Sequence, residues 1–422
     1  MSTADGKPAD IKRFALNTDC AECHPRQWRE MKGSLHSVAH RDTLYRRTAE
    51  LARKEAGEAV YAYCAGCHTP QGVASRLVPT TPEAKLPEAV KAGVTCDACH
   101  SISALTGKSG PWKEQGNASI QLTPNDDLKF GPLTGDDEAA AHEVKSLAFF
   151  QRSEFCASCH TVVHPLNGVR IEHTYGEWKK SIYAKKGIQC QDCHMRTVAQ
   201  ARKVAATLER VELRGASTAE GERPIAHHFF AGGNASADLV GGGKAHARMA
   251  AELLKAAARL ELKAPAQARG RLLRLEVAVT NVGAGHALPT SLTELREMWV
   301  DLQVRGPDGA LLFRSGGLDV AGDIDAGAMR FGARAGDRHG RLTYKPWEIT
   351  QFLWKRLIAP KATARDAFHV PLPAGLRGPL TVTARLLYRS APPRVLKLLY
   401  GAHPPKLRVV QMARASRTVA TN

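Results

Sequence analysis

The sequence predicts an α+β protein, in which a mostly helical, loop-rich N-terminal domain is followed by a C-terminal β-sandwich domain. Five short motifs of the form C-x-x-C-H lie in the first half of the 422 residues, between helical segments and loops. From Arg271 onward, apolar and polar residues alternate with a period of two, as in half-buried strands. We therefore expect a first domain at residues 1–240, a connecting helix at 241–268 and the sandwich at 269–422.

The N-terminal domain is predicted to consist of short helices that lead into the motifs. Residues 1–10 are expected to form a flexible tail, and residues 101–137, rich in Gly, Pro, Ser, Asn and Asp, a long connection. The expected helices are Cys20–Met31, Leu35–Gly57, Ala59–His68, Pro87–Ala92, Asp136–Arg152 and Thr174–Lys186. Residues Val198–Leu213 are expected to be a strand or an extended connector.

The second half of the chain changes from helical to strand patterning. Lys244–Leu260 carries apolar residues at helical spacing. Beyond it, turn signals such as Gly306-Pro307-Asp308-Gly309 separate short alternating runs, a pattern typical of a β-sandwich. The expected strands are Leu273–Val279, Met298–Val304, Ala310–Ser315, Ile349–Trp354, Ala367–Val370 and Leu380–Tyr388.

The five C-x-x-C-H motifs contain all ten cysteines of the chain. The cysteines are Cys20, Cys23, Cys64, Cys67, Cys96, Cys99, Cys156, Cys159, Cys190 and Cys193, and the histidines are His24, His68, His100, His160 and His194. This spacing is the attachment signature of c-type haem, in which both thiols form thioethers to the porphyrin and the histidine binds the iron. A zinc site would need a second C-x-x-C for each tetrahedron. We therefore predict five c-type haems with iron, and neither a disulfide nor a free thiol.

The predicted haem attachment also indicates the cellular location of the protein. Haem is attached in this way on the outer side of the energised membrane, so a periplasmic or extracellular location is expected. The chain opens without a basic segment followed by an apolar one, so the export signal has been removed or the true start lies upstream. No run of 18 apolar residues is present, so no transmembrane segment is expected.

The formal net charge of +18 admits two interpretations. Each haem brings two propionates, and pairing with these accounts for much of the excess Arg and Lys. The alternative is docking to an acidic partner. Nucleic-acid binding is not expected, because no motif supports it and the basic residues are scattered.

Several longer stretches carry recognisable patterns. Ser153–Met195 contains S-E-F-C-A-S-C-H, H-P-x-N-G, T-Y-x-E-W and C-Q-D-C-H-M, and further patterned stretches are His228–Asn234, Thr280–Thr290 and Tyr388–Pro393. Together they resemble the multihaem cytochromes c of the hydroxylamine oxidoreductase-linked type, which include many exported pentahaem to decahaem proteins. The chain is also similar to subunits of extracellular cytochrome filaments. The resemblance covers most of the chain.

The resemblance implies four further iron ligands, one on the second side of each of four haems. These distal histidines are His36, His142, His228 and His286. His40 is the rival of His36, and His227 is the rival of His228. Gly283 and Gly285 precede His286 and should leave room for a large planar group. With His286 bound, the β-sandwich would complete an iron site of the other domain.

The fifth distal ligand stays open at this point. His164, four residues after a motif histidine, is favoured, and His246 is the second choice. The family pattern does not require a histidine at position 173. An open site, a methionine ligand (Met195 or Met249) and a ligand from a neighbouring subunit are the other possibilities.

Electron transfer is the favoured function, since two imidazoles on each iron leave no position for a substrate. The first alternative is an oxidoreductase that acts on a small nitrogen or sulfur compound at one open haem. The second is a subunit of a conductive filament or of a larger electron-transfer complex. Expected partners are redox proteins, such as other cytochromes or a membrane electron-transfer complex, and further copies of this chain in a homo-oligomer.

Overall fold

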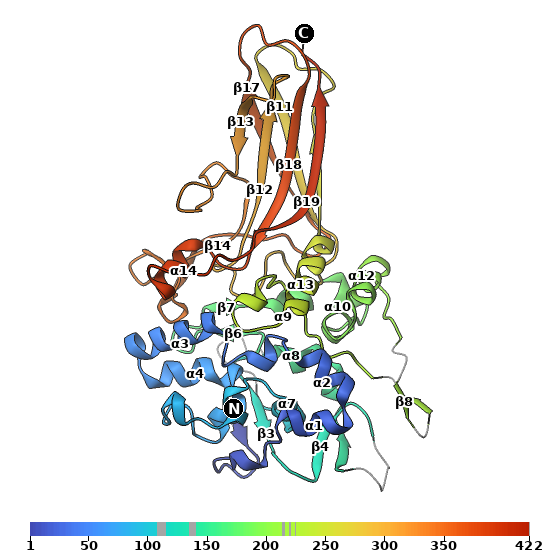
Figure 1. Cartoon of the computed structure of the whole chain (residues 1–422), viewed down its shortest axis with the longest axis vertical. Helices are drawn as coiled ribbons and strands as arrows, with labels where there is room; N and C mark the ends of the chain where they lie inside the picture. Colours follow the sequence, from blue (N-terminus) through green and yellow to red (C-terminus); the bar gives the residue numbers. More distant parts are fainter. Residues whose placement is uncertain (108–114, 135–140, 213–215, 219–220, 224, 422) are drawn as a thin grey trace.

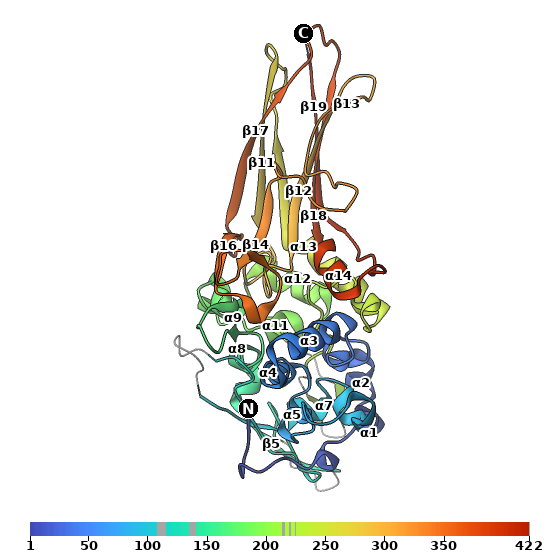
Figure 2. The same cartoon turned by 90° about the vertical axis from the view of Figure 1, so that its left-hand side faces the viewer.

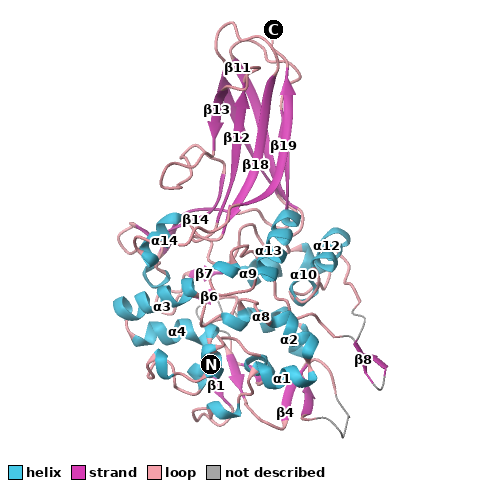
Figure 3. Ribbon diagram, viewed as in Figure 1, coloured by secondary structure: helices cyan, strands magenta, loops and turns pink. Residues whose placement is uncertain are grey.

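The computed structural model describes residues 1–107, 115–134, 141–212, 216–218, 221–223 and 225–421. It confirms the α+β class: a helix-rich body carries an upright β-sandwich, with the C-terminus at the far tip of the strands (Figures 1 and 3). None of the helices in these ranges is long and apolar enough to cross a membrane.

The N-terminal body is assembled from short helices that begin at ordinary capping residues. Asp42 accepts from the backbone N–H groups of Leu44 and Tyr45 and starts α3, and Thr95 caps α7. The helices are α1 Asn17–Cys23, α2 Pro25–Met31, α3 Thr43–Ala56, α4 Glu58–His68, α5 Pro70–Ala74, α6 Glu88–Lys91, α7 Cys96–His100, α8 Ser153–Ala157, α9 Thr174–Lys179, α10 Ile182–Lys185, α11 Gln191–His194 and α12 Val198–Thr207, with one-turn 3₁₀ segments such as η2 His36–Val38 between them.

Small sheets join these helices, and they correct two expectations. The strands are β1 Ser2–Thr3, β2 Ile102–Leu105, β3 Ile120–Leu122, β4 Leu128–Gly131, β5 Glu143–Ser146, β6 Val162–Val163, β7 Arg170–Glu172, β8 Ala216–Thr218 and β9 Gly221–Arg223. Residues 1–10 are not simply a tail, because β1 pairs with β3. The predicted helix Asp136–Arg152, part of which lies outside the described residues, is wrong: β5 pairs with β4, so backbone pairing overrides local helical preference.

A third correction concerns Val198–Leu213, which was expected to be extended. Residues 198–207 form helix α12, which begins with a capping box: Thr197 accepts from the Gln200 backbone, and the Gln200 side chain accepts from the backbone N–H of Thr197. The helix ends at Leu208, whose backbone is left-handed. The capping box and the alanine-rich run that follows it are both helix signals, and the expectation of an extended segment overlooked them.

The C-terminal half is a sandwich of two sheets, as predicted. One sheet is β10 Ala258–Lys263, β11 Leu272–Asn281 and β17 Thr363–Pro371; the other is β12 Glu297–Arg305, β13 Leu311–Ser315, β14 Arg330–Gly336, β15 Leu342–Thr343, β16 Gln351–Arg356, β18 Leu380–Arg389 and β19 Val410–Val419. Strands β10, β14, β15 and β19 were not predicted. Val277 of the first sheet packs in one core with Leu302 and Leu386 of the second.

Two helices lie between the sandwich and the body (Figure 2). Helix α13, Lys244–Ala257, ends three residues earlier than predicted, because Ala258 already pairs with Asn281 as the first residue of β10. Its Leu254 belongs to the sandwich core. Helix α14, Pro393–Tyr400, reaches α3: the hydroxyl groups of Tyr400 and Thr43 lie 2.9 Å apart. The two halves are therefore packed against each other.

Candidate functional site

Each C-x-x-C-H motif forms about one helical turn, which places its reactive side chains on one face. Residues at i, i+3 and i+4 of a helix are neighbours. The backbone N–H groups of His24, His160 and His194 donate to the carbonyl of the first cysteine of their motifs at 2.9 Å. None of the ten cysteines is part of a disulfide. In every motif two thiols and an imidazole are thus ready to hold one planar group.

The five motifs open into one large cavity of about 3710 Å³. It is lined by the ten cysteines, the five motif histidines and His36, His142, His164, His228, His246 and His286. Shared among five groups, this volume gives roughly 700 Å³ for each, within the range of cofactor pockets. The principal apolar core lies in the sandwich, and the clusters of the helical body are small. The cavity therefore has room for five porphyrins, which would supply the apolar interior that the helical body lacks.

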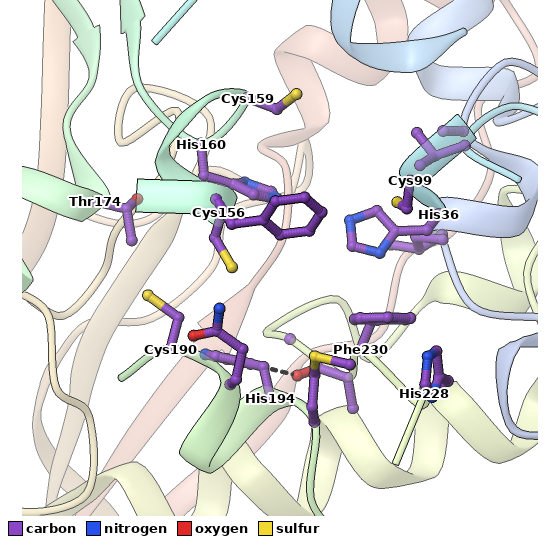
Figure 4. A pocket seen from close by; sticks show the side chains of 18 of the residues that line it. His36, Cys99, Cys156, Cys159, His160, Thr174, Cys190, His194, His228 and Phe230 are labelled. Carbon is purple, nitrogen blue, oxygen red and sulfur yellow. Dashed lines mark hydrogen bonds between the residues drawn. The ribbon is translucent and has the colours of Figure 1, made fainter. Parts of the chain in front are cut away.

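Four motif histidines each face a second imidazole across this cavity. Ring centroids are 6.3 Å apart for His24 and His142, 6.5 Å for His100 and His228, 6.0 Å for His160 and His36, and 6.3 Å for His194 and His286. Because a metal–imidazole bond is about 2 Å long, two imidazoles on opposite sides of one iron have centroids roughly 6 Å apart. Figure 4 shows His36 and His160 entering the cavity from different segments. All four predicted distal residues are in such pairs.

Hydrogen bonds fix the tautomer of these rings. The Nδ1–H groups of His100, His194 and His286 donate to the carbonyls of residues 130, 231 and 287 at 2.7–2.9 Å. The other ring nitrogen, Nε2, then keeps its lone pair for a metal. Burial lowers the pKa of His36 to about 3 and the pKa of His194 to about 4, so both rings are neutral, as ligation requires.

The turn that carries His286 is anchored on both domains. The buried Asn281 side chain donates to the His286 carbonyl at 2.8 Å and accepts from the Ala284 N–H. Glu177 of α9, in the body, accepts from the Ala287 N–H at 3.1 Å and from the Thr290 hydroxyl. The sandwich therefore presents this imidazole in a fixed position.

The glycines of this turn permit close packing of the turn against its protein neighbours. A Cβ at Gly283 would lie 2.3 Å from the carbonyl oxygen of Ala256, at the end of α13, so this glycine permits close approach of two backbones. At Gly285 the neighbour is the ring of Tyr183, 3.3 Å from a built Cβ. Both glycines also line the cavity, as expected if they leave room for a planar group.

The loop that carries His228 is held by a buried carboxylate. Glu30 of α2, only 8% exposed, accepts from the His228 backbone N–H at 2.8 Å. Its other oxygen lies 2.7 Å from Nδ1 of His227, the rival candidate, which is thereby engaged. Glu30 was not found from the sequence, since an acidic residue on a helix gives no signal of a distant partner.

Replacing Glu30 with Ala should loosen His228. We expect the iron site at His100 to become partly five-coordinate and the free energy of unfolding to fall by about 1–3 kcal/mol, since a buried hydrogen-bonding set is lost. The high-spin signal in electron paramagnetic resonance and thermal unfolding measure the two effects. Glu22→Ala, an exposed residue of the first motif, is the matched control. An unchanged spectrum and melting temperature would show that other contacts suffice.

The second motif differs from the others. Within the described ranges no imidazole is paired with His68 in the way seen above; the ring of Tyr45 instead stacks on it at 3.7 Å, nearly parallel. His68 still donates from Nδ1 to the Ala39 carbonyl at 3.1 Å. His40, the rival of His36, directs Nε2 to Glu83 at 3.1 Å.

The two candidates for the fifth distal ligand are held by other groups. His164 Nε2 lies 3.1 Å from the Trp347 carbonyl, and its Nδ1 accepts from the Leu166 N–H at 3.3 Å. His246 Nε2 lies 2.9 Å from the Glu30 carbonyl. Both rings line the cavity, and in the described residues neither is brought opposite His68.

Contacts between cysteines of different motifs give the order of the sites. The thiol groups of Cys20 and Cys96, of Cys67 and Cys159, and of Cys156 and Cys190 interact directly through hydrogen bonds. Cys99 is near enough to Cys159 for a charge on one to affect the other. The first site is therefore beside the third, the third beside the fourth, and the second and fifth are both beside the fourth. The fourth site, at His160, is a junction.

Two motif aspartates neutralise part of the positive charge. Asp97, 1% exposed, lies 2.9 Å from Lys129, and Asp192, also 1% exposed, lies 3.1 Å from Arg196 and 2.9 Å from Arg210. These cations line the cavity. In the third and fifth motifs, an aspartate between the two cysteines thus anchors the motif in the body.

Comparisons with known proteins give a family match for part of the chain and a shared fold for nearly all of it. Residues 19–101 match the family "Cytochrome c554 and c-prime". The chain has the fold of a penta-heme cytochrome c552 from Thermochromatium tepidum, with a TM-score of 0.70, 19% identity and coverage of 97% of this chain and 100% of that one. The CARDB domain of the PF1109 protein from Pyrococcus furiosus aligns with 39% of this chain and 87% of its own at 14% identity. Its TM-score of 0.19 is too low to indicate a shared fold. No curated protein matches in sequence.

The family match and the shared fold support the resemblance to multihaem cytochromes c that the motifs predicted. They also support multiple c-type haems with iron as the cofactors.

Proposed function

We propose that this multihaem c-type cytochrome carries electrons through five covalently bound haems. The observation that supports the proposal best is the set of four facing imidazole pairs around one continuous cavity. Six-coordinate iron changes its charge with little change of geometry and leaves no position for a substrate, as electron transfer requires. The haems supply the one-electron chemistry, and the chain supplies the spacing, the ligands and the local charge.

The residues have separate roles in this proposal. The ten cysteines attach the five groups, and His24, His68, His100, His160 and His194 are the proximal ligands. His142 serves the first iron, His228 the third, His36 the fourth and His286 the fifth. We retain residues 1–240 as the haem domain and 269–422 as the sandwich that donates His286. Of the connection at 241–268, residues 258–263 form β10 and belong to the first sheet of the sandwich.

The order of the sites gives a branched route with the fourth site at its centre. One limb comprises the first and third sites, and the second and fifth sites are two further limbs. The first site lies at the end of its limb, farthest from the junction, and serves in this proposal as the point of contact for a redox partner. Partners are redox proteins, such as another cytochrome or a membrane electron-transfer complex, met in the periplasm or outside the cell.

A second candidate function is favoured at the second site. No imidazole faces His68 in the described ranges, and two buried polar atoms beside it, Nδ1 of His40 and the hydroxyl of Tyr45, have no hydrogen-bond partner. Buried polar groups without partners are rare, so a small polar molecule would be stabilised there. One five-coordinate iron would then bind or convert a small nitrogen or sulfur compound.

We expect four low-spin irons and one high-spin iron in each oxidised chain. Electron paramagnetic resonance should give that ratio, and the reduced protein should bind one carbon monoxide per chain. Five low-spin irons would contradict the open second site. If carbon monoxide bound only on dilution, a second copy of the chain would be supplying the missing ligand, as in a homo-oligomer or filament.

A further inference from the structure

The histidine at the junction differs from the other motif histidines in what its ring contacts. His68, His100 and His194 direct Nδ1 to backbone carbonyls. Nδ1 of His160 lies instead 3.4 Å from a carboxylate oxygen of Glu172. A carboxylate is a stronger acceptor than a carbonyl because it carries a full negative charge.

Glu172 follows His160 by only 12 residues, and a short hairpin brings its carboxylate beside the imidazole ring. Strands β6 and β7 form a hairpin directly after His160, and Val162 pairs with Glu172 across it. Glu172 is only 7% exposed, and the Thr174 hydroxyl lies 3.5 Å from the same carboxylate oxygen. The charge is thus held away from bulk water, where screening would weaken its effect.

A carboxylate on the second nitrogen makes an imidazole a more basic ligand. The same donation of charge stabilises ferric iron relative to ferrous iron. The couple is a one-electron couple, Fe³⁺ plus an electron giving Fe²⁺, and the neighbouring sites supply and remove the electron.

We propose that Glu172 is a positioning residue that lowers the reduction potential of the fourth site below that of the same site with a neutral partner. This inference rests on the proposed function, because it requires iron at His160. Its consequence follows from the junction: every electron that moves between the limb of the first and third sites and the other two limbs must cross a low-potential centre. Electrons would therefore reside on the limbs.

The test is a redox titration of the five-haem protein followed by electron paramagnetic resonance, comparing the wild type with Glu172→Gln. Gln has the same shape and keeps an acceptor oxygen but carries no charge. We expect one of the five potentials to rise enough to change the ferrous-to-ferric ratio at least tenfold at fixed potential, which is about 59 mV for one electron. The other four should move less.

Two further variants make the outcome decisive. Glu154→Gln removes a half-buried carboxylate two residues before Cys156, but that carboxylate accepts from the Tyr175 hydroxyl and not from a ligand, so its potentials should match the wild type. Glu172→Asp keeps the charge and should lie nearer to the wild type than Glu172→Gln does.

The possible results separate the two proposals. A wild-type mass without five porphyrins would remove the proposed function itself. Five haems in both proteins with unchanged potentials, or equal shifts in Glu172→Gln and Glu154→Gln, would overturn the role of Glu172 alone. If Glu172→Gln fails to load haem, a Glu172→Asp protein with a shift as large as tenfold in the same ratio would also overturn it.

Discussion

Replacing His286 with Ala should turn one further iron high-spin, so that the ratio changes from four low-spin and one high-spin to three and two. The imidazole facing His194 is lost, and the buried turn offers no replacement, because the nitrogen and oxygen of Asn281 are already engaged. The reduced variant should bind two carbon monoxide molecules per chain. Loss of a bond between domains should also lower the free energy of unfolding by more than about 2 kcal/mol.

The control for this change is His369→Ala. His369 is an exposed histidine on β17 of the same domain, far from the turn in sequence. Its removal should leave both the spin states and the unfolding curve unchanged. If His286→Ala keeps the wild-type ratio, the sandwich does not complete the fifth site.

Preventing haem attachment should have a still larger effect: residues 1–240 should fail to fold, while the sandwich survives. The helical body surrounds a cavity of about 3710 Å³, and its own apolar clusters are small. A void of that size would cost far more than the few kcal/mol by which domains are stable. The sandwich has a continuous core of its own, from Leu260 to Val419.

Limited proteolysis measures this outcome. A chain made without haem-attachment enzymes should be cut rapidly in its first half and leave a fragment that begins near α13. The haem-loaded chain, digested in parallel, should resist throughout the body. A resistant N-terminal half without haem would mean that the body collapses into a different, filled core.

The covalent sites could be predicted from the sequence because their chemistry is local. A C-x-x-C-H motif needs only one helical turn, so its spacing alone predicts what the cysteines and histidine do. The distal residues could not be found in this way, since His36 and His160 are 124 positions apart and meet only in the fold. There the resemblance to a known family supplied His36, His142, His228 and His286 in advance.

Other features depend on partners that the sequence does not reveal. The strand β5 exists because β4 lies beside it. Likewise β14 pairs with β12, β15 and β16, and β19 pairs with β18 at the edge of the sheet. Glu30 and Glu172 looked like ordinary charged residues. Their roles follow from burial and from which nitrogen they touch, neither of which has a periodic signature.

The anchored turn between Asn281 and Thr290 also bears on how the protein matures. During synthesis residue 194 is made before residue 286, so the pocket around His194 stays incomplete until the sandwich has folded and packed against the body. A prematurely terminated chain would carry all five attachment motifs and still display a defective centre. Completion of that pocket therefore requires that the sandwich has been made and has folded.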